Sequence, residues 1–341
     1  MKETRHQSFR QRLLIHALML FALGGWGAAL AAPAHGDQPA DAVAWLEKMV
    51  TAAKKLNYTG TFTYQSGGES ETSRITHIVG AAGEFERLEV LDGSPREVVR
   101  NNDEIRCYLP DDKLVIVEKR RQHKAFPALL PASVGYLDEH YQIHMGETAR
   151  VAGLVSQLVV LEPKDTLRYG YQLWADIDSG LLLKARMVDE HHGTIEQFAF
   201  SQIQIDGLID KSLLKSRFDE ESKTWRIYDA RAAQSFSAGG DWQFKNPLPG
   251  FKKSAGMKRR SRIQNGGEVT HFVFTDGLAS ISVFIEPLGE AQRARQKRAT
   301  YSAGAINVYK RVTGKHLLTI LGEVPMASLK HLGDGMELRR K

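Results

Sequence analysis

Apolar and polar residues alternate along much of this 341-residue chain. That period of two is typical of β-strands with one buried face. The clearest case is the segment 168–184, where Tyr171 and Leu173 share one face of a first strand and a second strand alternates in the same way after it. Gly180 lies between the two strands and tolerates a positive φ, so the segment predicts a hairpin with a tight turn.

One segment near the start has a helical period instead. Between residues 41 and 56, apolar side chains recur at the spacing of one helix face, as at Val43, Leu46 and Met49. The rest of the first half predicts short antiparallel strands, because turn residues separate its alternating segments. We expect these strands at 57–65, 74–79, 85–91, 97–100, 105–109, 114–119, 147–152, 157–161, 167–175, 181–188 and 195–205.

A second and smaller module follows. The segment 206–240 is predicted to be a connection, since its later part is rich in Ala, Ser and Gly. The residues after position 34 are too many for one ordinary core, so we expect domains at 35–205 and 241–341. In the second domain we expect strands at 269–275, 281–286, 305–309 and 317–321, and a short helix at 325–332.

These elements predict an α+β protein. The first domain is expected to be a strongly curved sheet wrapped around the helix. A sheet that curves without closing leaves an apolar interior, which is either filled by side chains or open to a lipid. The sequence leaves both alternatives open. The residues that would line a lipid cavity are Phe62, Tyr64, Phe85, Leu88, Val90, Leu181, Leu183 and Met187.

The segment 1–34 is typical of a cleavable export signal. Four basic residues precede an apolar run at 13–23, and small residues at 29–34 satisfy the small-x-small cleavage pattern. We therefore expect an exported, soluble mature protein. The alternative is an uncleaved membrane anchor, since 13–32 is long enough to cross a bilayer.

The net charge of +6 divides unevenly along the chain. Residues 35–203 hold 18 Lys and Arg against 25 Asp and Glu, whereas residues 204–341 hold 24 against 14. This asymmetry indicates two modules with different surfaces. The basic stretch 252–262 would suit a nucleic acid by composition. Export argues against that partner and favours lipid phosphates or an acidic peptide, and a solvated loop explains the charges as well.

No sequence motif supports catalysis. The chain has no G-x-S-x-G, P-loop, G-x-G-x-x-G or C-x-x-C pattern. His140 and His144 have the spacing of two metal ligands, but no third ligand lies near them in sequence. The lone Cys107 alternates with apolar neighbours, which predicts a buried small side chain. We expect no catalytic residue, metal or cofactor, and a binding protein, not an enzyme.

Short motifs in a fixed order resemble the RseB/MucB family over most of the chain after the predicted signal. The connection at 206–240 fits the family pattern least. The matching motifs are NYTGTF at 57–62, the hairpin at 169–184, EQF at 196–198, LPGF at 248–251, TDGLAS at 275–280 and GEVP at 322–325.

The resemblance implies a fold and a partner. The first domain would be similar to LolA and LolB, an unclosed antiparallel β-barrel with covering helices, and the second would be a small α/β domain. The family implies a periplasmic negative regulator of the envelope-stress sigma factor. Such a protein binds the periplasmic region of a membrane anti-sigma factor like RseA or MucA and protects it from regulated proteolysis. Lipopolysaccharide or another acyl lipid would relieve the protection.

A second class of function stays open, because the first domain alone would suit a periplasmic lipid or lipoprotein carrier. The second domain discriminates, since simple carriers lack it. A homo-oligomer is also left open, and no nucleic acid is expected. The partner-binding candidates are Leu248, Pro249, Phe251, Lys258, Arg259, Arg260, Thr275, Asp276, Gly277, Ser280 and Glu323.

Overall fold

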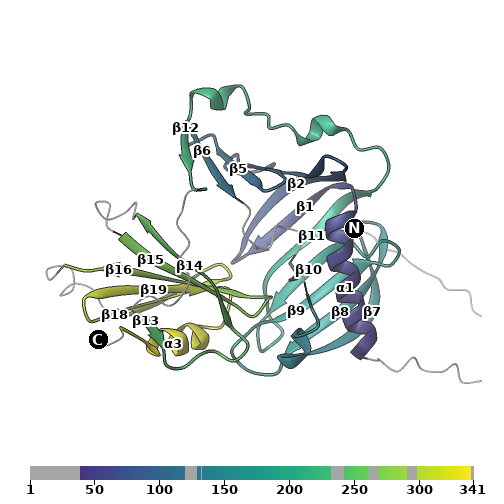
Figure 1. Cartoon of the computed structure of the whole chain (residues 1–341). Helices are drawn as coiled ribbons and strands as arrows, with labels where there is room; N and C mark the ends of the chain where they lie inside the picture. Colours follow the sequence, from purple (N-terminus) through teal and green to yellow (C-terminus); the bar gives the residue numbers. More distant parts are fainter. Residues whose placement is uncertain are drawn as a thin grey trace, which may run out of the picture. The chain divides into compact units, whose positions relative to one another are not determined.

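Figure 1 shows the computed structural model of the chain. The structure describes residues 39–119, 129–131, 133–231, 242–260, 268–289 and 298–338. The predicted export signal at 1–34 and the last two residues of the basic stretch, 261–262, lie outside the described ranges.

The alternating segments of the first domain form one large sheet, which has twelve strands among the described residues. All neighbouring pairs are antiparallel except β12 with β6. The sheet runs from β12 at one edge to β7 at the other, in the order β12-β6-β5-β4-β3-β2-β1-β11-β10-β9-β8-β7, so it is unclosed as expected. The strands are β1 (Tyr58–Ser66), β2 (Glu69–Gly80), β3 (Gly83–Val90), β4 (Glu97–Asn101), β5 (Glu104–Leu109), β6 (Leu114–Lys119), β7 (Tyr141–Val151), β8 (Leu154–Pro163), β9 (Gly170–Asp176), β10 (Leu182–Val188), β11 (Thr194–Ile205) and β12 (Arg226–Asp229).

The predicted hairpin is β9 and β10. Gly180 has a φ of +79°, as the turn requires. The Asp176 carboxylate accepts hydrogen bonds from both the backbone N–H and the hydroxyl of Ser179, at 2.8 and 2.6 Å. This local bonding stabilises the turn independently of the rest of the sheet.

The predicted helix is α1 (Pro39–Lys55), which lies along one face of the large sheet over β7, β8 and β10 (Figure 1). We call this the inner face and the opposite one the outer face. Leu46 and Met49 of α1 are fully buried in one core with Leu161, Leu173 and Leu183. The side chains at helical spacing therefore fill this part of the curved sheet.

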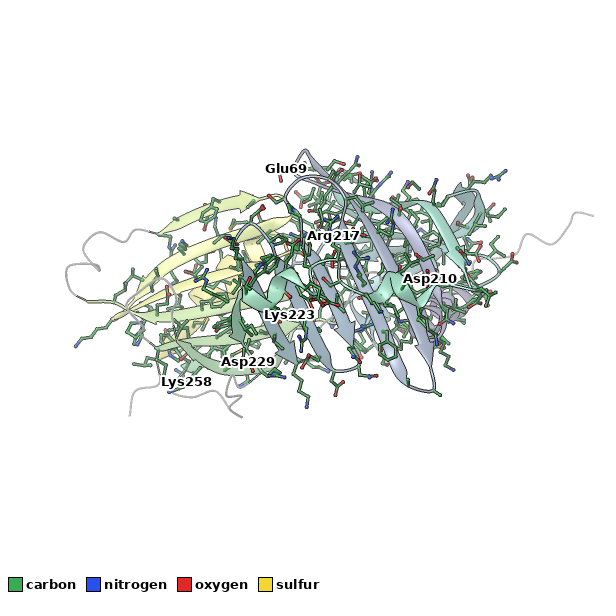
Figure 2. All side chains as sticks on the ribbon, turned by 90° about the horizontal axis from the view of Figure 1, so that it is seen from above. Glu69, Asp210, Arg217, Lys223, Asp229 and Lys258 are labelled. Carbon is green, nitrogen blue, oxygen red and sulfur yellow. The ribbon has the colours of Figure 1, made fainter. Side chains whose placement is uncertain are left out.

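The predicted connection is described up to residue 231, and it packs on the outer face of the large sheet. It contains two short 3-10 helices, η2 (Lys211–Leu214) and η3 (Glu221–Thr224), before β12. Asp210, Arg217, Lys223 and Asp229 mark its path across the strands in Figure 2. Phe218 and Trp225 pack with a small core on β5 and β6. Since β12 pairs with β6, the described part of the connector belongs to the first domain.

Ion pairs hold the connector to the sheet. Glu97 is fully buried and bonds the guanidinium groups of Arg87 at 2.7 Å and Arg217 at 3.3 Å. Arg87 also donates to the backbone oxygen of Leu213. Removing such charges from water is costly unless they are paired, so this network fixes the path of the connector.

The second domain is a six-stranded antiparallel sheet in the order β14-β15-β16-β19-β18-β17, with one helix and one small ribbon among its described residues. The predicted C-terminal helix is α3, and the basic stretch 252–260 is β14 rather than a loop. Among the described residues, no helix is long and apolar enough to cross a membrane. The elements are β13 (Trp242–Phe244), β14 (Lys252–Arg260), β15 (Glu268–Thr275), β16 (Ser280–Pro287), β17 (Ala299–Ala303), β18 (Ile306–Thr313), β19 (His316–Gly322), α3 (Met326–Asp334) and β20 (Met336–Leu338).

Candidate functional site

The motif loops of the second domain pack against the first domain. Residues 37–341 group into one compact unit by their contacts, and both domains contribute to it. The central contact, which we call the seam, consists of Tyr141 and Arg168 from the first domain and Pro249, Phe251 and Asp276 from the second. The motif residues Phe251 and Asp276 are both buried there.

Arg168 is the centre of the seam. Its guanidinium pairs with the Asp276 carboxylate at 3.0 Å, and both side chains are completely shielded from solvent. It also donates to the Pro249 backbone oxygen at 2.6 Å and pairs with Asp165 at 3.0 Å. The ring of Phe251 lies 5.4 Å from the guanidinium carbon. A planar cation with five donors fits this set of partners, whereas a lysine does not.

Asp276 is bonded on both of its carboxylate oxygens. Oδ1 accepts from the backbone N–H groups of Leu278 and Ala279 at 2.9 and 2.7 Å. Oδ2 faces Arg168 and also accepts from the Tyr141 hydroxyl at 3.3 Å. Burial raises the pKa of Tyr141, and the Asp276 charge raises it further, so the phenol stays a donor.

Further contacts extend the seam. Ser328 of α3 donates to the Leu167 backbone oxygen at 2.6 Å, and Asn307 of β18 donates to the Tyr169 hydroxyl at 3.0 Å. Gly277 has a φ of +96°, and a Cβ there would lie 2.0 Å from the Tyr136 hydroxyl. The motif glycine is therefore needed both for its backbone conformation and for close packing against the first domain.

This placement constrains the predicted partner-binding residues. Leu248, Phe251, Asp276 and Gly277 face the interior in this arrangement and present no open surface to a partner. Ser280 and Pro249 are exposed, Thr275 and Glu323 are partly buried, and exposed Lys258 pairs with Glu268 at 2.6 Å. The side chains of Arg259 and Arg260 lie outside the described residues. Partner binding by this set stays a prediction.

Sequence reasoning missed Tyr141 and Arg168 as seam residues. Arg168 begins the predicted hairpin, but its partner Asp276 lies 108 positions away in the other domain. A strand pattern cannot identify such a partner. The available signal was that Asp276 stood inside one matching motif and that Arg168 directly preceded another.

The predicted lipid-lining residues fall into two groups. Leu181, Leu183 and Met187 are buried with Phe62 in the core beneath α1, so they fill the sheet there. Val90 is also buried, whereas Leu88 is half-buried and Tyr64 is exposed at 36%. The helix therefore occupies part of the interior that a lipid would need.

Phe85 was wrongly placed on the same face as Leu88 and Val90. Its cross-strand partner is Ile78, whereas Leu88 pairs with Ile75. Residues 85 and 88 are an odd number of positions apart, so their side chains point to opposite faces of a strand. Phe85 lies on the outer face.

An apolar row continues across the inner face beyond the helix. Cross-strand pairing joins Ile75, Leu88, Val98, Cys107 and Ile116 in sequence from β2 to β6. Ile75 is fully buried and the other four are partly buried. Cys107 is therefore less buried than predicted, and desolvation raises its pKa, so the thiol stays protonated. Among the residues that the structure describes, these strands offer a partly uncovered apolar surface.

A carboxylate and a phenol meet at another end of the inner face. The Tyr64 hydroxyl donates to Glu196, which belongs to the EQF motif. Burial raises the pKa of Glu196, and the charge of Glu323 from the second domain raises it further. Residues of one matching motif in each domain thus influence each other electrostatically.

The histidines do not form a metal site among the described residues, where no cluster of three or more His, Cys, Asp or Glu side chains has that geometry. His140 lies beside Gly250, close to the seam. His144 is on β7, and the atom Nδ1 is buried without a hydrogen-bond partner.

Comparison with protein families matches both domains. The MucB/RseB N-terminal domain matches residues 41–218, and the MucB/RseB C-terminal domain matches residues 237–337. The first match extends past residue 205 into the connector, in agreement with its packing on the large sheet.

Individual proteins match over most of their length. The sigma factor AlgU regulatory protein MucB of Pseudomonas aeruginosa is 29% identical over 90% of this chain and 93% of its own length. The sigma-E factor regulatory protein RseB of Haemophilus influenzae is 26% identical over 86% of this chain and 90% of its own. A crystal structure of MucB in complex with MucA(peri) superposes with a TM-score of 0.71 at 27% identity, covering 88% of this chain and all of that one.

Proposed function

Because the chain belongs to the MucB/RseB family, we propose that it regulates an envelope-stress sigma factor from the periplasm. In this proposal it binds the periplasmic segment of a membrane anti-sigma factor and protects that segment from regulated proteolysis. One observation carries the proposal: both domains match over nearly their full length a protein whose solved structure is a complex with MucA(peri).

The direct test is binding to the periplasmic segment of the MucA-like or RseA-like protein from the same genome. We expect a stable complex and slower cleavage of the segment by an added protease. A matched control is the same segment with its order of residues scrambled. If the native segment binds no better than the scrambled one, and its cleavage is not slowed, the proposal fails.

We also propose that the apolar row on β3–β6 of the inner face accepts an acyl chain, which then weakens anti-sigma binding. The support is the partly uncovered row of Leu88, Val98, Cys107 and Ile116. Each buried methylene contributes about 0.8 kcal/mol, so a long chain could outweigh a moderate protein contact. Linkage requires that such a lipid bind the free protein better than the complex.

Cys107 provides the readout for this part, since it is the single cysteine of the sequence. We expect lipopolysaccharide or a lipid A analogue to slow maleimide labelling of Cys107 and to release the anti-sigma segment. Labelling that is unchanged at saturating lipid would exclude the row as the binding surface.

The alternative is a lipid or lipoprotein carrier, which the apolar inner face also suits. A carrier transfers lipid between vesicles with no anti-sigma partner. Lipid transfer without any binding of the anti-sigma segment would favour this alternative.

A further inference from the structure

The outer face of the hairpin strand β10 carries two cations that have no carboxylate partner. Lys184 and Arg186 alternate with the buried residues Leu183, Ala185 and Met187, so both point away from the inner core. Among the residues that the structure describes, neither cation forms an ion pair. Both are partly buried rather than fully solvated.

Other buried arginines of this chain are matched by acids. Arg87 contacts Glu97 and Glu89, at 2.7 and 3.3 Å, and Arg100 contacts both Glu84 and Glu86. Arg168 likewise contacts two aspartates. These pairs offset the loss of hydration.

Arg186 departs from that pattern. Its guanidinium donates a hydrogen bond to the neutral amide oxygen of Gln172 at 3.4 Å, and its Nε is buried without a partner. Its cross-strand neighbour on β11 is Gln197, whose side chain is another neutral amide. The site therefore has excess positive charge.

Trp174 holds the two cations in place. The Lys184 ammonium lies 4.5 Å from the indole centroid, and the Arg186 guanidinium carbon lies 5.6 Å from it. Trp174 is the direct cross-strand neighbour of Lys184 and is only 8% exposed. Cation–π contacts with one ring orient both side chains before any ligand binds.

The proximity of these like charges has a measurable effect. Burial lowers the pKa of Lys184, and the charge of Arg186 lowers it further. An anion bound between the two groups would raise the pKa of Lys184 again, because it supplies the missing countercharge.

We propose that Lys184 and Arg186 form a binding site for a phosphate monoester on the outer face of β9 and β10. The single negative charge of a carboxylate is balanced by one arginine. Because Lys184 and Arg186 carry two positive charges, a ligand with two negative charges balances them better. The neutral amide of Gln172 can supply a further donor. A free phosphate and a lipid headgroup that ends in a phosphate share this chemistry.

The first experiment uses the unmodified full chain. Lysine acetylation is followed by mass spectrometry at neutral pH, with and without inorganic phosphate. We expect phosphate to slow acetylation of Lys184 by about tenfold for each unit by which its pKa rises. Lys55 at the exposed end of α1 is the internal control, and its rate should not change. Equal rates at Lys184 with and without phosphate would overturn the site for free phosphate.

The second experiment compares variants. K184Q/R186Q removes both cations of the site, and K55Q/R150Q removes the same charge from exposed positions of the same domain. We expect phosphate binding to weaken at least about tenfold in K184Q/R186Q and to be unchanged in the control. Equal losses in both variants would show non-specific attraction and refute the proposal.

Vesicles distinguish the two sources of the ligand. Phosphatidylcholine vesicles that contain phosphatidic acid present a phosphate monoester, whereas those with phosphatidylserine present the same kind of surface without one. Flotation with phosphatidic acid that K184Q/R186Q abolishes would assign the headgroup as the ligand. Phosphate protection of Lys184 without flotation would assign the soluble anion. The proposal is wrong if neither probe protects Lys184.

Discussion

Replacing Arg168 with methionine should loosen the two domains at the seam. Methionine keeps an apolar stem next to Phe251 but removes every donor. The Asp276 carboxylate then stays buried without its cation, and the Pro249 oxygen loses a hydrogen bond. Removing one partner of a buried pair costs about 3–5 kcal/mol of unfolding free energy. For a chain of this size, that lowers the melting temperature by about 5–8 °C.

Unfolding in urea, followed by near-UV circular dichroism, measures the free energy. The matched control is Arg96→Met, because Arg96 also pairs with a glutamate, Glu71, but at 3.1 Å on the surface. That exposed pair should contribute less than about 1 kcal/mol. The reasoning is refuted if Arg168→Met costs no more than the control.

A double-mutant cycle separates the pair from general packing. Asp276→Asn keeps an oxygen that can accept from the backbone N–H groups of Leu278 and Ala279. In combination with Arg168→Met it removes the stranded charge. The double variant should therefore cost less than the sum of the single ones, by at least about 1 kcal/mol. Strict additivity would mean that the two groups do not interact.

Three other predictions concern single side chains. Leu46→Ala should lower the unfolding free energy by about 2–5 kcal/mol, because it leaves a cavity beneath α1. The control Val155→Ala, at an exposed site, should change it by less than about 0.5 kcal/mol. Equal effects of the two substitutions in chemical denaturation would contradict the core assignment. Glu97→Gln should speed proteolysis within 206–231, because Arg87 and Arg217 lose their shared carboxylate. Glu71→Gln should not, because Glu71 pairs with Arg96 outside the connector, and cleavage at the same rate in both variants would argue against the network. The raised pKa of Glu196 means that the folded protein holds this proton more tightly, so the contribution of this group to stability is lost as the pH rises from about 4.5 through that pKa. The melting temperature of the wild type should therefore fall relative to that of Glu196→Gln over this pH range, and parallel profiles would count against it.

The elements that the sequence predicted are those whose causes are local. The helix at 41–56 follows from apolar spacing, and the hairpin turn follows from Asp176 and Gly180. The family resemblance and its motifs singled out the loops of the second domain that lie at the seam. The periodicity of those loops could not tell whether they would face a partner or the other domain.

What the sequence did not predict depends on distant charges. The connector was predicted to be a linker because its later part is rich in Ala, Ser and Gly, yet Arg217 binds Glu97, which lies 120 positions away. The error at Phe85 had a simpler cause, which was a miscount along β3. Residues 85 and 88 are three positions apart, so Phe85 lies on the other face of the strand from Leu88. Lys184 and Arg186 were visible as alternating cations, but only the register shows that neutral side chains surround them.

The parallel pairing of β12 with β6 has a consequence for competition between partners. Because β12 belongs to the large sheet, the tether between the domains begins only at Arg231 and ends at Trp242. A chain of that length spans at most about 40 Å. A second domain released from the seam would stay within that radius of the first. Any external protein that uses the motif loops must therefore outcompete a neighbour that cannot diffuse away, and loss of that protein would restore the seam without a bimolecular search.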